Sequence, residues 1–234
     1  MKSELPPIVL EPKSKADACV IWLHGLGADG HDFENIVPEL KLPADHTIRF
    51  VFPTAGKMPV TVNLGSEMTA WYDIHSLDLL NDVDWAGIDQ SVQFVHELVE
   101  SQISSGIESD KILLAGFSQG GVVILNAGLK FKKPLAGMMA LSTYFPEPRA
   151  DDVVFSQPKT CPVFMAHGMN DPVCPFFVAE QSRQKLIELG LQPQWHTYPM
   201  QHQVCLDEIK DMAAFVRQCL VVESLNKPGL EELT

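Results

Sequence analysis

The most reactive pattern in this sequence is a serine placed between glycines. Residues 116–120 read Gly-Phe-Ser-Gln-Gly, which matches the pattern G-x-S-x-G around Ser118. The apolar run before it, residues 111–115, predicts a buried strand, and the residues from Gly121 to about Lys130 predict a helix. Such a tight strand-to-helix turn strains the serine backbone and exposes its hydroxyl group. The pattern indicates a nucleophile elbow, although a glycine-rich turn that merely contains a serine fits the same five residues.

A serine hydroxyl is a weak nucleophile at neutral pH, so it needs a base that is oriented by a third group. A suitable acid and base follow Ser118 in the order Ser, Asp, His. Asp171 follows a strand predicted at residues 162–166, and His202 follows a strand predicted at residues 193–198. In a parallel sheet the loops after the strands meet at one edge. We therefore expect these three side chains to converge.

Other histidines and acids compete for the two supporting positions. His167 directly follows a predicted strand, where we expect its ring to pack or cap, and His196 lies inside a strand. The competing acids lie in a charged loop at residues 142–160 or within the last predicted helix: Asp151, Asp152 and Asp207. The alternative interpretations are an Asn-Asp-Pro turn for Asp171 and a surface-loop histidine for His202.

Acyl transfer also needs hydrogen-bond donors for the developing oxyanion. The backbone N–H of Gln119, directly after the serine, is one candidate. The Leu26 N–H is the second, because it lies in a glycine-rich loop that follows a strand predicted at residues 18–23. The same loop reads G-L-G-A-D-G, the literal dinucleotide-binding pattern, but a histidine precedes it. The acidic residue expected about 20 positions on is also missing, apart from Asp45 before the next strand. Dinucleotide binding is therefore disfavoured.

Composition and charge exclude several other functions. The chain has 17 basic and 30 acidic residues and a net charge of −13, which disfavours nucleic acids and anionic lipid surfaces as partners.

His96-Glu97 begins a zinc-binding H-E-x-x-H pattern that residues 98–100 do not complete, so we expect neither a metal nor a cofactor. No apolar run approaches the roughly 18 residues that span a bilayer, and no apolar signal core begins the chain. Five scattered cysteines suit reduced thiols. We expect a cytoplasmic protein without stable membrane insertion.

Alternating strands and helices predict an α/β domain over residues 1–220, with a mostly parallel central sheet and helices on both faces. Residues 221–234 are expected to form a flexible acidic tail. Residues 54–81 show no regular pattern and contain the aromatic pair Trp71-Tyr72. A long irregular insertion of this kind is often functional, so we expect Trp71 to line the acyl pocket, with an ordinary surface excursion as the alternative. The other predicted elements are strands at 47–53 and 135–141 and helices at 32–40, 84–105, 175–189 and 204–220.

Five motifs occur in the order found in a known family, and the resemblance covers roughly residues 8–220. The sequence resembles the acyl-protein thioesterases and lysophospholipase-type carboxylesterases, and two stretches, at 28–29 and 71–74, are most similar to the bacterial carboxylesterase branch. The motifs are residues 20–27, residues 71–73, residues 116–121, His167-Gly168 with Asp171, and residues 198–200 before His202.

The resemblance implies an α/β-hydrolase fold without a large cap domain. It implies hydrolysis of carboxylic esters or thioesters with short to medium acyl chains, on a small-molecule or lipid-like substrate, through an acyl-serine intermediate. It also implies a homodimer. The implied site residues are the catalytic Ser118, Asp171 and His202 and the oxyanion donors Leu26 and Gln119.

One position departs from the family pattern. The residue before the catalytic histidine is usually glycine, whereas here it is Gln201. If that position requires a positive φ, glutamine strains the loop and lowers activity. This departure and the acidic charge motivate an alternative, a catalytically weak or inactive hydrolase scaffold that acts in protein interaction. A serine peptidase on the same fold is a third interpretation.

Overall fold

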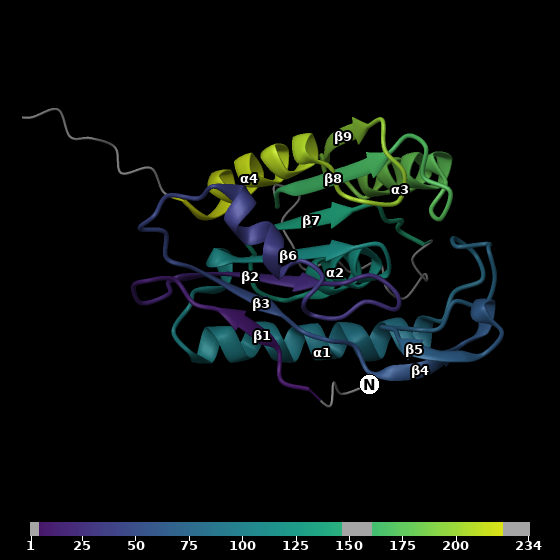
Figure 1. Cartoon of the computed structure of the whole chain (residues 1–234), viewed down its shortest axis with the longest axis horizontal. Helices are drawn as coiled ribbons and strands as arrows, with labels where there is room; N and C mark the ends of the chain where they lie inside the picture. Colours follow the sequence, from purple (N-terminus) through teal and green to yellow (C-terminus); the bar gives the residue numbers. More distant parts are fainter. Residues whose placement is uncertain (1–4, 147–160, 222–234) are drawn as a thin grey trace, which may run out of the picture.

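A seven-stranded sheet forms the middle layer of the protein (Figure 1). The computed structural model describes residues 5–146 and 161–221. The strand order is β1-β3-β2-β6-β7-β8-β9, and every neighbouring pair is parallel except β1 with β3. The predicted mostly parallel sheet is therefore confirmed. The strands are β1 (Ile8–Leu10), β2 (Ala18–Leu23), β3 (Ile48–Phe52), β6 (Ile112–Phe117), β7 (Gly137–Leu141), β8 (Val163–Gly168) and β9 (Gln194–Tyr198).

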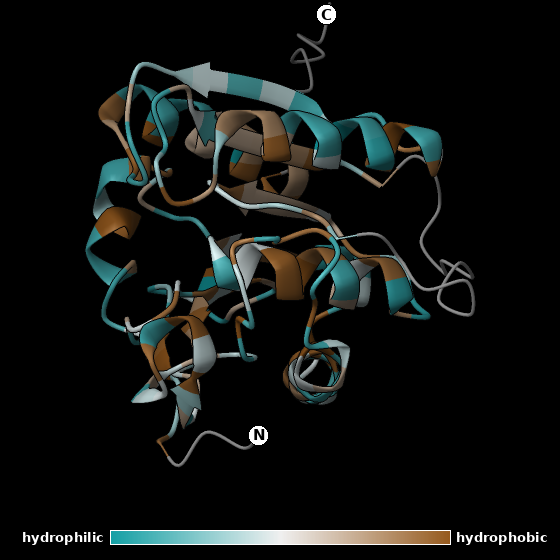
Figure 2. Ribbon diagram, turned by 90° about the vertical axis from the view of Figure 1, so that its right-hand side faces the viewer, coloured by the Kyte–Doolittle hydropathy of each residue, from teal (hydrophilic) through white to brown (hydrophobic). Residues whose placement is uncertain are grey.

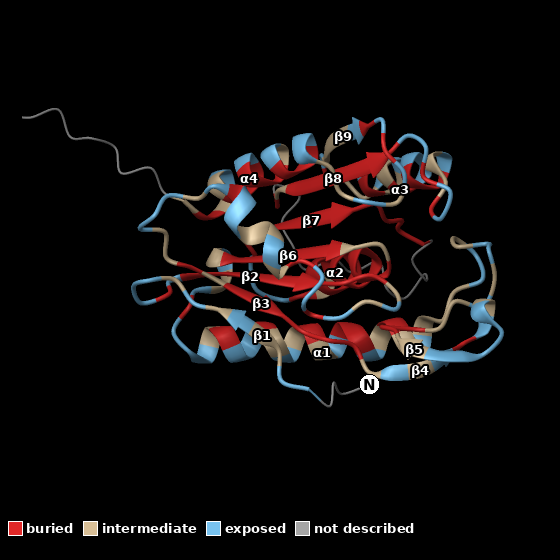
Figure 3. Ribbon diagram, in the orientation of Figure 1, coloured by how far each residue is buried: buried red, intermediate tan, exposed pale blue. Residues whose placement is uncertain are grey.

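Helices cover both faces of this sheet. In β2, alternate residues belong to two separate hydrophobic clusters: Ile21 joins the cluster that includes residues of α1, α2 and α3, whereas Val20 joins the cluster that includes α4. Strands with two buried faces read as continuous apolar runs, which is why β2, β6, β7 and β8 were predictable. Figure 3 shows them buried at the centre, and Figure 2 shows polar residues along the outer helices. The helices are α1 (Trp85–Ser104), α2 (Gln119–Lys130), α3 (Phe176–Glu188) and α4 (Leu206–Leu220).

Several local expectations need correction. The irregular region at residues 54–81 contains an antiparallel two-stranded sheet, β4 (Lys57–Val60) with β5 (Ser66–Thr69). The helix predicted at 32–40 is a 3-10 helix, η1 (Glu34–Leu40), with Pro38 inside it. The edge strand β1 was not predicted. Leu206, the first residue of α4, is 70% exposed. Two further short 3-10 helices are η2 (Thr61–Asn63) and η3 (Ser109–Lys111).

Two expectations concern parts of the chain outside the described residues. The predicted loop at 142–160 leaves the described part after residue 146, and Asp151 and Asp152 lie beyond it. The predicted tail leaves the described part after residue 221. Within the described ranges, no helix combines the length and the apolar character needed to cross a bilayer.

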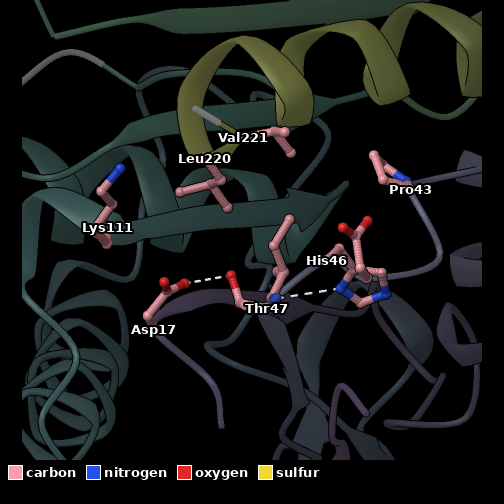
Figure 4. Close-up of a pocket in the computed structure, with 9 residues that line it drawn as sticks. Asp17, Pro43, His46, Thr47, Lys111, Leu220 and Val221 are labelled. Carbon is pink, nitrogen blue, oxygen red and sulfur yellow. Dashed lines mark hydrogen bonds between the residues drawn. The ribbon is translucent and has the colours of Figure 1, made fainter. Parts of the chain in front are cut away.

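A pocket of about 220 Å³ opens at the amino ends of β2, β3 and β6 (Figure 4). Within its lining, the Thr47 hydroxyl donates a hydrogen bond to Asp17. The sequence-predicted site residues follow the opposite, carboxyl ends of the strands, so this pocket is separate from the candidate site. Its lining residues are Asp17, Pro43, Asp45, His46, Thr47, Ile48, Lys111, Leu220 and Val221.

Candidate active site

Ser118 occupies the sharp turn between β6 and α2. Its backbone has φ 52° and ψ −118°, a conformation that L-residues rarely adopt. Close packing enforces this turn. A Cβ atom at Gly116 would lie 2.4 Å from the Gly120 carbonyl oxygen, and one at Gly120 would lie 2.6 Å from the Leu23 carbonyl oxygen. Only glycine fits these two positions, which explains the two glycines of the pattern in physical terms.

Loops from three strands bring Ser118, His202 and Asp171 into one hydrogen-bonded row. The His202 Nε2 atom lies 2.9 Å from the Ser118 Oγ atom, and the His202 Nδ1 atom lies 2.7 Å from the Asp171 Oδ2 atom. A carboxylate can only accept, so Nδ1 carries the proton and Nε2 is free to accept the serine proton. This is the arrangement of a nucleophile, a general base and an orienting acid.

Asp171 is held as a buried carboxylate. Its side chain is completely buried, and its Oδ1 atom accepts hydrogen bonds from the backbone N–H groups of Val173 (2.8 Å) and Cys174 (2.9 Å). Burial alone would raise its pKa. The hydrogen bonds from His202, Cys174 and Val173 outweigh that effect and hold the pKa of Asp171 below its ordinary value. The carboxylate therefore stays ionised at neutral pH, where it can stabilise a positively charged imidazole.

The aromatic ring of Phe117 lies against His202, with ring centroids 4.8 Å apart. Phe117 also contacts Phe33 at 5.5 Å, and Phe33 stacks on Trp22 at 5.0 Å. The imidazole is therefore held by packing as well as by the Asp171 hydrogen bond. Sequence reasoning missed Phe117, although it fills the variable position directly before the serine in the elbow pattern.

The competing side chains do not join this row. His167 is buried, donates through Nε2 to the Cys174 carbonyl at 2.8 Å, and has its pKa lowered by burial. Its Nε2 atom is 3.5 Å from the Asp171 Oδ2 atom, farther than the His202 ring. His196 lies on β9 and faces Asp211 at 3.3 Å. Asp207 contacts only Lys210 among the described ion pairs.

Both candidate oxyanion donors lie beside Ser118. Gln119 begins α2, where the first N–H groups have no acceptor within the helix. The loop with Leu26 approaches Ser118 closely, since a Cβ atom at Gly25 would lie 3.4 Å from the Ser118 Cβ atom. Within the described residues, neither the Leu26 N–H nor the Gln119 N–H donates to a protein acceptor. Both are therefore available to a ligand.

Trp71 contacts both Gln119 and the loop that contains Leu26. Its side chain is 4% exposed, its indole Nε1–H donates to the His24 carbonyl at 2.9 Å, and its backbone N–H donates to the Gln119 Oε1 atom at 2.8 Å. The expected contact of Trp71 with an acyl chain stays a prediction.

Gln201, which stands where the family usually has glycine, does not have a positive φ. Among the described residues, four non-glycine residues have positive φ, namely Lys41, Leu64, Ser118 and Ser142. Gln201 is exposed and is not one of them. The close approach at this loop is made possible by Gly168 instead, where a Cβ atom would lie 2.4 Å from the Gln201 carbonyl oxygen.

A parallel sheet with a strained serine after β6, an acid after β8 and a histidine after β9 defines an α/β-hydrolase. A sequence model of the phospholipase/carboxylesterase family matches residues 6–220, so the chain belongs to this family. Acyl-protein thioesterase 1 of Neurospora crassa is 36% identical over 92% of this chain and 92% of its own length. The Schizosaccharomyces pombe protein of the same name is 37% identical over 80% of this chain and 83% of its own length.

Solved structures agree with this assignment. The crystal structure of Arabidopsis thaliana SOBER1 has a TM-score of 0.80 and 26% identity, covering 87% of this chain and 99% of that chain. The crystal structure of Zea mays acyl-protein thioesterase 2 has a TM-score of 0.76 and 26% identity, covering 92% of this chain and 98% of that chain. The protein is thus a hydrolase of ester or thioester bonds, as the motifs predicted.

Proposed function

We propose that Ser118, His202 and Asp171 form the catalytic triad of this hydrolase. The Ser118 Oγ atom attacks the carbonyl carbon of the ester or thioester while its proton passes to His202 Nε2. The tetrahedral intermediate collapses, the leaving alcohol or thiol takes the proton from His202, and an acyl-serine remains. Water, deprotonated by the same His202, then releases the acid. The 2.9 Å contact between His202 and Ser118 is the observation that supports this proposal.

The backbone N–H groups of Leu26 and Gln119 are proposed to bind the oxyanion of both tetrahedral intermediates. Their freedom from protein acceptors and their position beside Ser118 support this role. A misplaced pair of donors would leave the developing charge unpaired in a partly buried site, which is costly.

The substrate is proposed to be an S-acylated protein or a similar acyl thioester or ester of short to medium chain length. The names of the Neurospora crassa and Schizosaccharomyces pombe relatives support the thioester assignment. The contribution of Trp71 to the acyl pocket is tested with Trp71→Ala. An unchanged chain-length preference in this variant would exclude the contact.

We further propose that the protein works in the cytoplasm as a homodimer without nucleic-acid partners. The net charge of −13 supports the last point, because like charges repel at long range. Sedimentation analysis measures the oligomeric state. A monomer at micromolar concentration would contradict the dimer.

The function is tested with a fluorophosphonate probe and a hydrolysis panel of p-nitrophenyl esters and acyl thioesters. We expect the wild type to be labelled and to hydrolyse both bond types, and Ser118→Ala to do neither. The inactive-scaffold alternative predicts no labelling of either protein, and the comparisons do not favour it. A serine peptidase would in addition cleave amide substrates.

A further inference from the structure

Both proposed oxyanion donors are connected through hydrogen bonds to one short segment, Thr69 to Tyr72. On the side of the nucleophile, the Gln119 side chain binds this segment twice: its Oε1 atom accepts from the Trp71 N–H at 2.8 Å, and its Nε2 group donates to the Tyr72 carbonyl at 2.6 Å. Gln119 is 1% exposed, so water does not compete for these bonds. The residue that offers one donor N–H is thereby fixed to the segment through its own side chain.

The loop with the second donor is bound to the same segment. The Trp71 indole N–H donates to the His24 carbonyl at 2.9 Å, and the Gly27 N–H donates to the Thr69 carbonyl at 2.8 Å. The Thr69 hydroxyl donates to the Ala28 carbonyl at 2.5 Å. The residues on both sides of Leu26 are therefore held by the segment that Gln119 binds.

The imidazole of His24 sets the direction of the Leu26 N–H. Its Nδ1 atom lies 2.6 Å from the Gly25 carbonyl oxygen, and its Nε2 atom accepts from the Ala55 N–H at 3.0 Å, which places the proton on Nδ1. The Gly25 carbonyl and the Leu26 N–H belong to one planar trans peptide, in which they point in opposite directions. A donor that fixes the carbonyl therefore also fixes the N–H. Burial lowers the pKa of His24, against the effects of Gly25 and Asp29, so the ring stays neutral.

We propose that Trp71 is a positioning residue that sets the distance and direction between the two oxyanion donors, by joining Gln119 to the His24 carbonyl. The indole is well placed for this role, because its ring also packs between His24 at 5.0 Å and Phe94 at 6.1 Å. Its backbone carbonyl accepts from the Ser91 hydroxyl, which anchors it to α1. This inference rests on the proposed function, since it concerns the donors of that same site.

The test replaces Trp71 with phenylalanine, which keeps an aromatic ring and removes the indole N–H. Loss of a whole oxyanion donor costs about 100- to 1,000-fold in rate, so a displaced donor should lower kcat by about 10- to 100-fold. We expect KM to stay within about twofold, because the donors act on the transition state more than on the bound substrate. Gln119→Met, which keeps the backbone N–H and removes the amide, should produce the same split. Trp85→Phe is the matched control, since it makes the same change at the start of α1, outside the segment, and we expect its kcat within about twofold of wild type.

The affinity for a trifluoromethyl ketone separates a positioning role from a purely structural one. The Ser118 oxygen adds to its carbonyl carbon, the serine proton passes to His202, and the resulting oxyanion occupies the donor site. We expect Trp71→Phe and Gln119→Met to weaken the ketone by the same factor as kcat/KM, and to leave binding of the matching secondary alcohol unchanged. If one of these two variants does not fold, the same measurements on the other variant still test the inference. An unchanged kcat, or a loss of kcat without a parallel loss of ketone affinity, would overturn the inference.

The proposed function can be judged separately in the same experiment. If Ser118→Ala keeps its hydrolytic activity, the triad assignment fails, and the inference fails with it. If Ser118→Ala is inactive while Trp71→Phe matches the wild type, only the positioning role is wrong.

Discussion

At the level of single residues, the proposed proton transfers depend on Asp171 and His202. Two backbone N–H groups and the His202 ring bind the Asp171 carboxylate, and its side chain is fully buried. This environment keeps the carboxylate charged and fixes the proton of His202 on Nδ1. The Nε2 atom is left as an acceptor 2.9 Å from the Ser118 oxygen. The direction of every proton transfer in the proposed mechanism follows from this one pair.

The substitution Asp171→Asn should separate geometry from charge. The amide keeps the size of the carboxylate, but it can donate to His202 Nδ1 and so favours the tautomer with the proton on Nε2, which cannot accept from serine. We expect kcat to fall by about 10³- to 10⁴-fold with a small change in KM. Steady-state kinetics on a p-nitrophenyl ester measure this.

Asp211→Asn is the control for that experiment. Asp211 accepts from the Tyr198 hydroxyl at 2.7 Å and faces His196, outside the row of Ser118, His202 and Asp171. We expect its kcat to stay within about twofold of wild type. Equal losses in both variants would show that Asp171 acts through stability and not through His202.

At the scale of elements, the sequence predicted most of the helices and strands that have a clear local pattern. Long buried strands such as β2 and β6 are apolar throughout, and the elbow pattern lies where β6 meets α2. The short strand β1 and the hairpin β4–β5 were missed, because three residues give no period and Pro59 interrupts the β4 pattern. Asp171 and His202 were found by their order after predicted strands. The Trp71 and Phe117 contacts could not be found, because they join residues that lie far apart in sequence.

The amino-terminal turn of α4 follows the His202 loop and contains a buried acid. Glu208 is fully buried, and neither of its carboxyl oxygens has a hydrogen-bond partner within the described residues. Burial raises its pKa to about 8, although the nearby Cys205 N–H acts in the opposite direction and Asp211 adds to the increase. The folded protein therefore holds a proton at neutral pH that the unfolded chain releases.

This difference predicts a pH-dependent stability. The pKa of Glu208 in the folded protein lies above its unfolded value of about 4.5. The stabilisation linked to protonated Glu208 is therefore complete below about pH 4.5 and is lost as the pH rises through about 8. Glu208→Gln removes the ionisation. Between pH 6 and pH 8 we expect the free energy of unfolding in urea to fall more in the wild type than in this variant, by about 2 kcal/mol.

Asp207→Asn on the same helix turn is the control, because Asp207 is exposed. It should retain the pH dependence of the wild type. An identical pH dependence in Glu208→Gln and the wild type would mean that Glu208 is ionised or hydrated in the fold.

At the scale of the whole molecule, the candidate site and the pocket lie at opposite edges of one sheet. The site lies at the carboxyl ends of β6, β8 and β9, as expected for parallel sheets, and the 220 Å³ pocket lies at the amino ends of β2, β3 and β6. Among the described residues, the cluster that includes α4 contains Leu220, and Val221 packs against it. The sequence predicts that the domain ends at residue 220, so we expect folding and catalysis to depend on residues 1–220.

Removal of residues 222–234 tests the predicted boundary between the domain and its tail. We expect the truncated protein to keep kcat within about twofold and its melting temperature within about 2 °C, because the sequence predicts a flexible acidic tail there. Circular dichroism melting and ester hydrolysis measure both. A drop of more than about 5 °C would contradict the proposed domain boundary and assign the last residues a part in the fold.

The central claim is that Ser118 becomes acylated, and trapping the intermediate tests it most directly. A p-nitrophenyl ester is mixed with enzyme, the reaction is quenched with acid within the burst phase, and the digested protein is mapped by mass spectrometry. We predict a burst of one nitrophenol per chain and an acyl group on the peptide that contains Ser118. Ser118→Ala should show neither. An acyl group on another residue, or an undiminished burst in Ser118→Ala, would contradict the account.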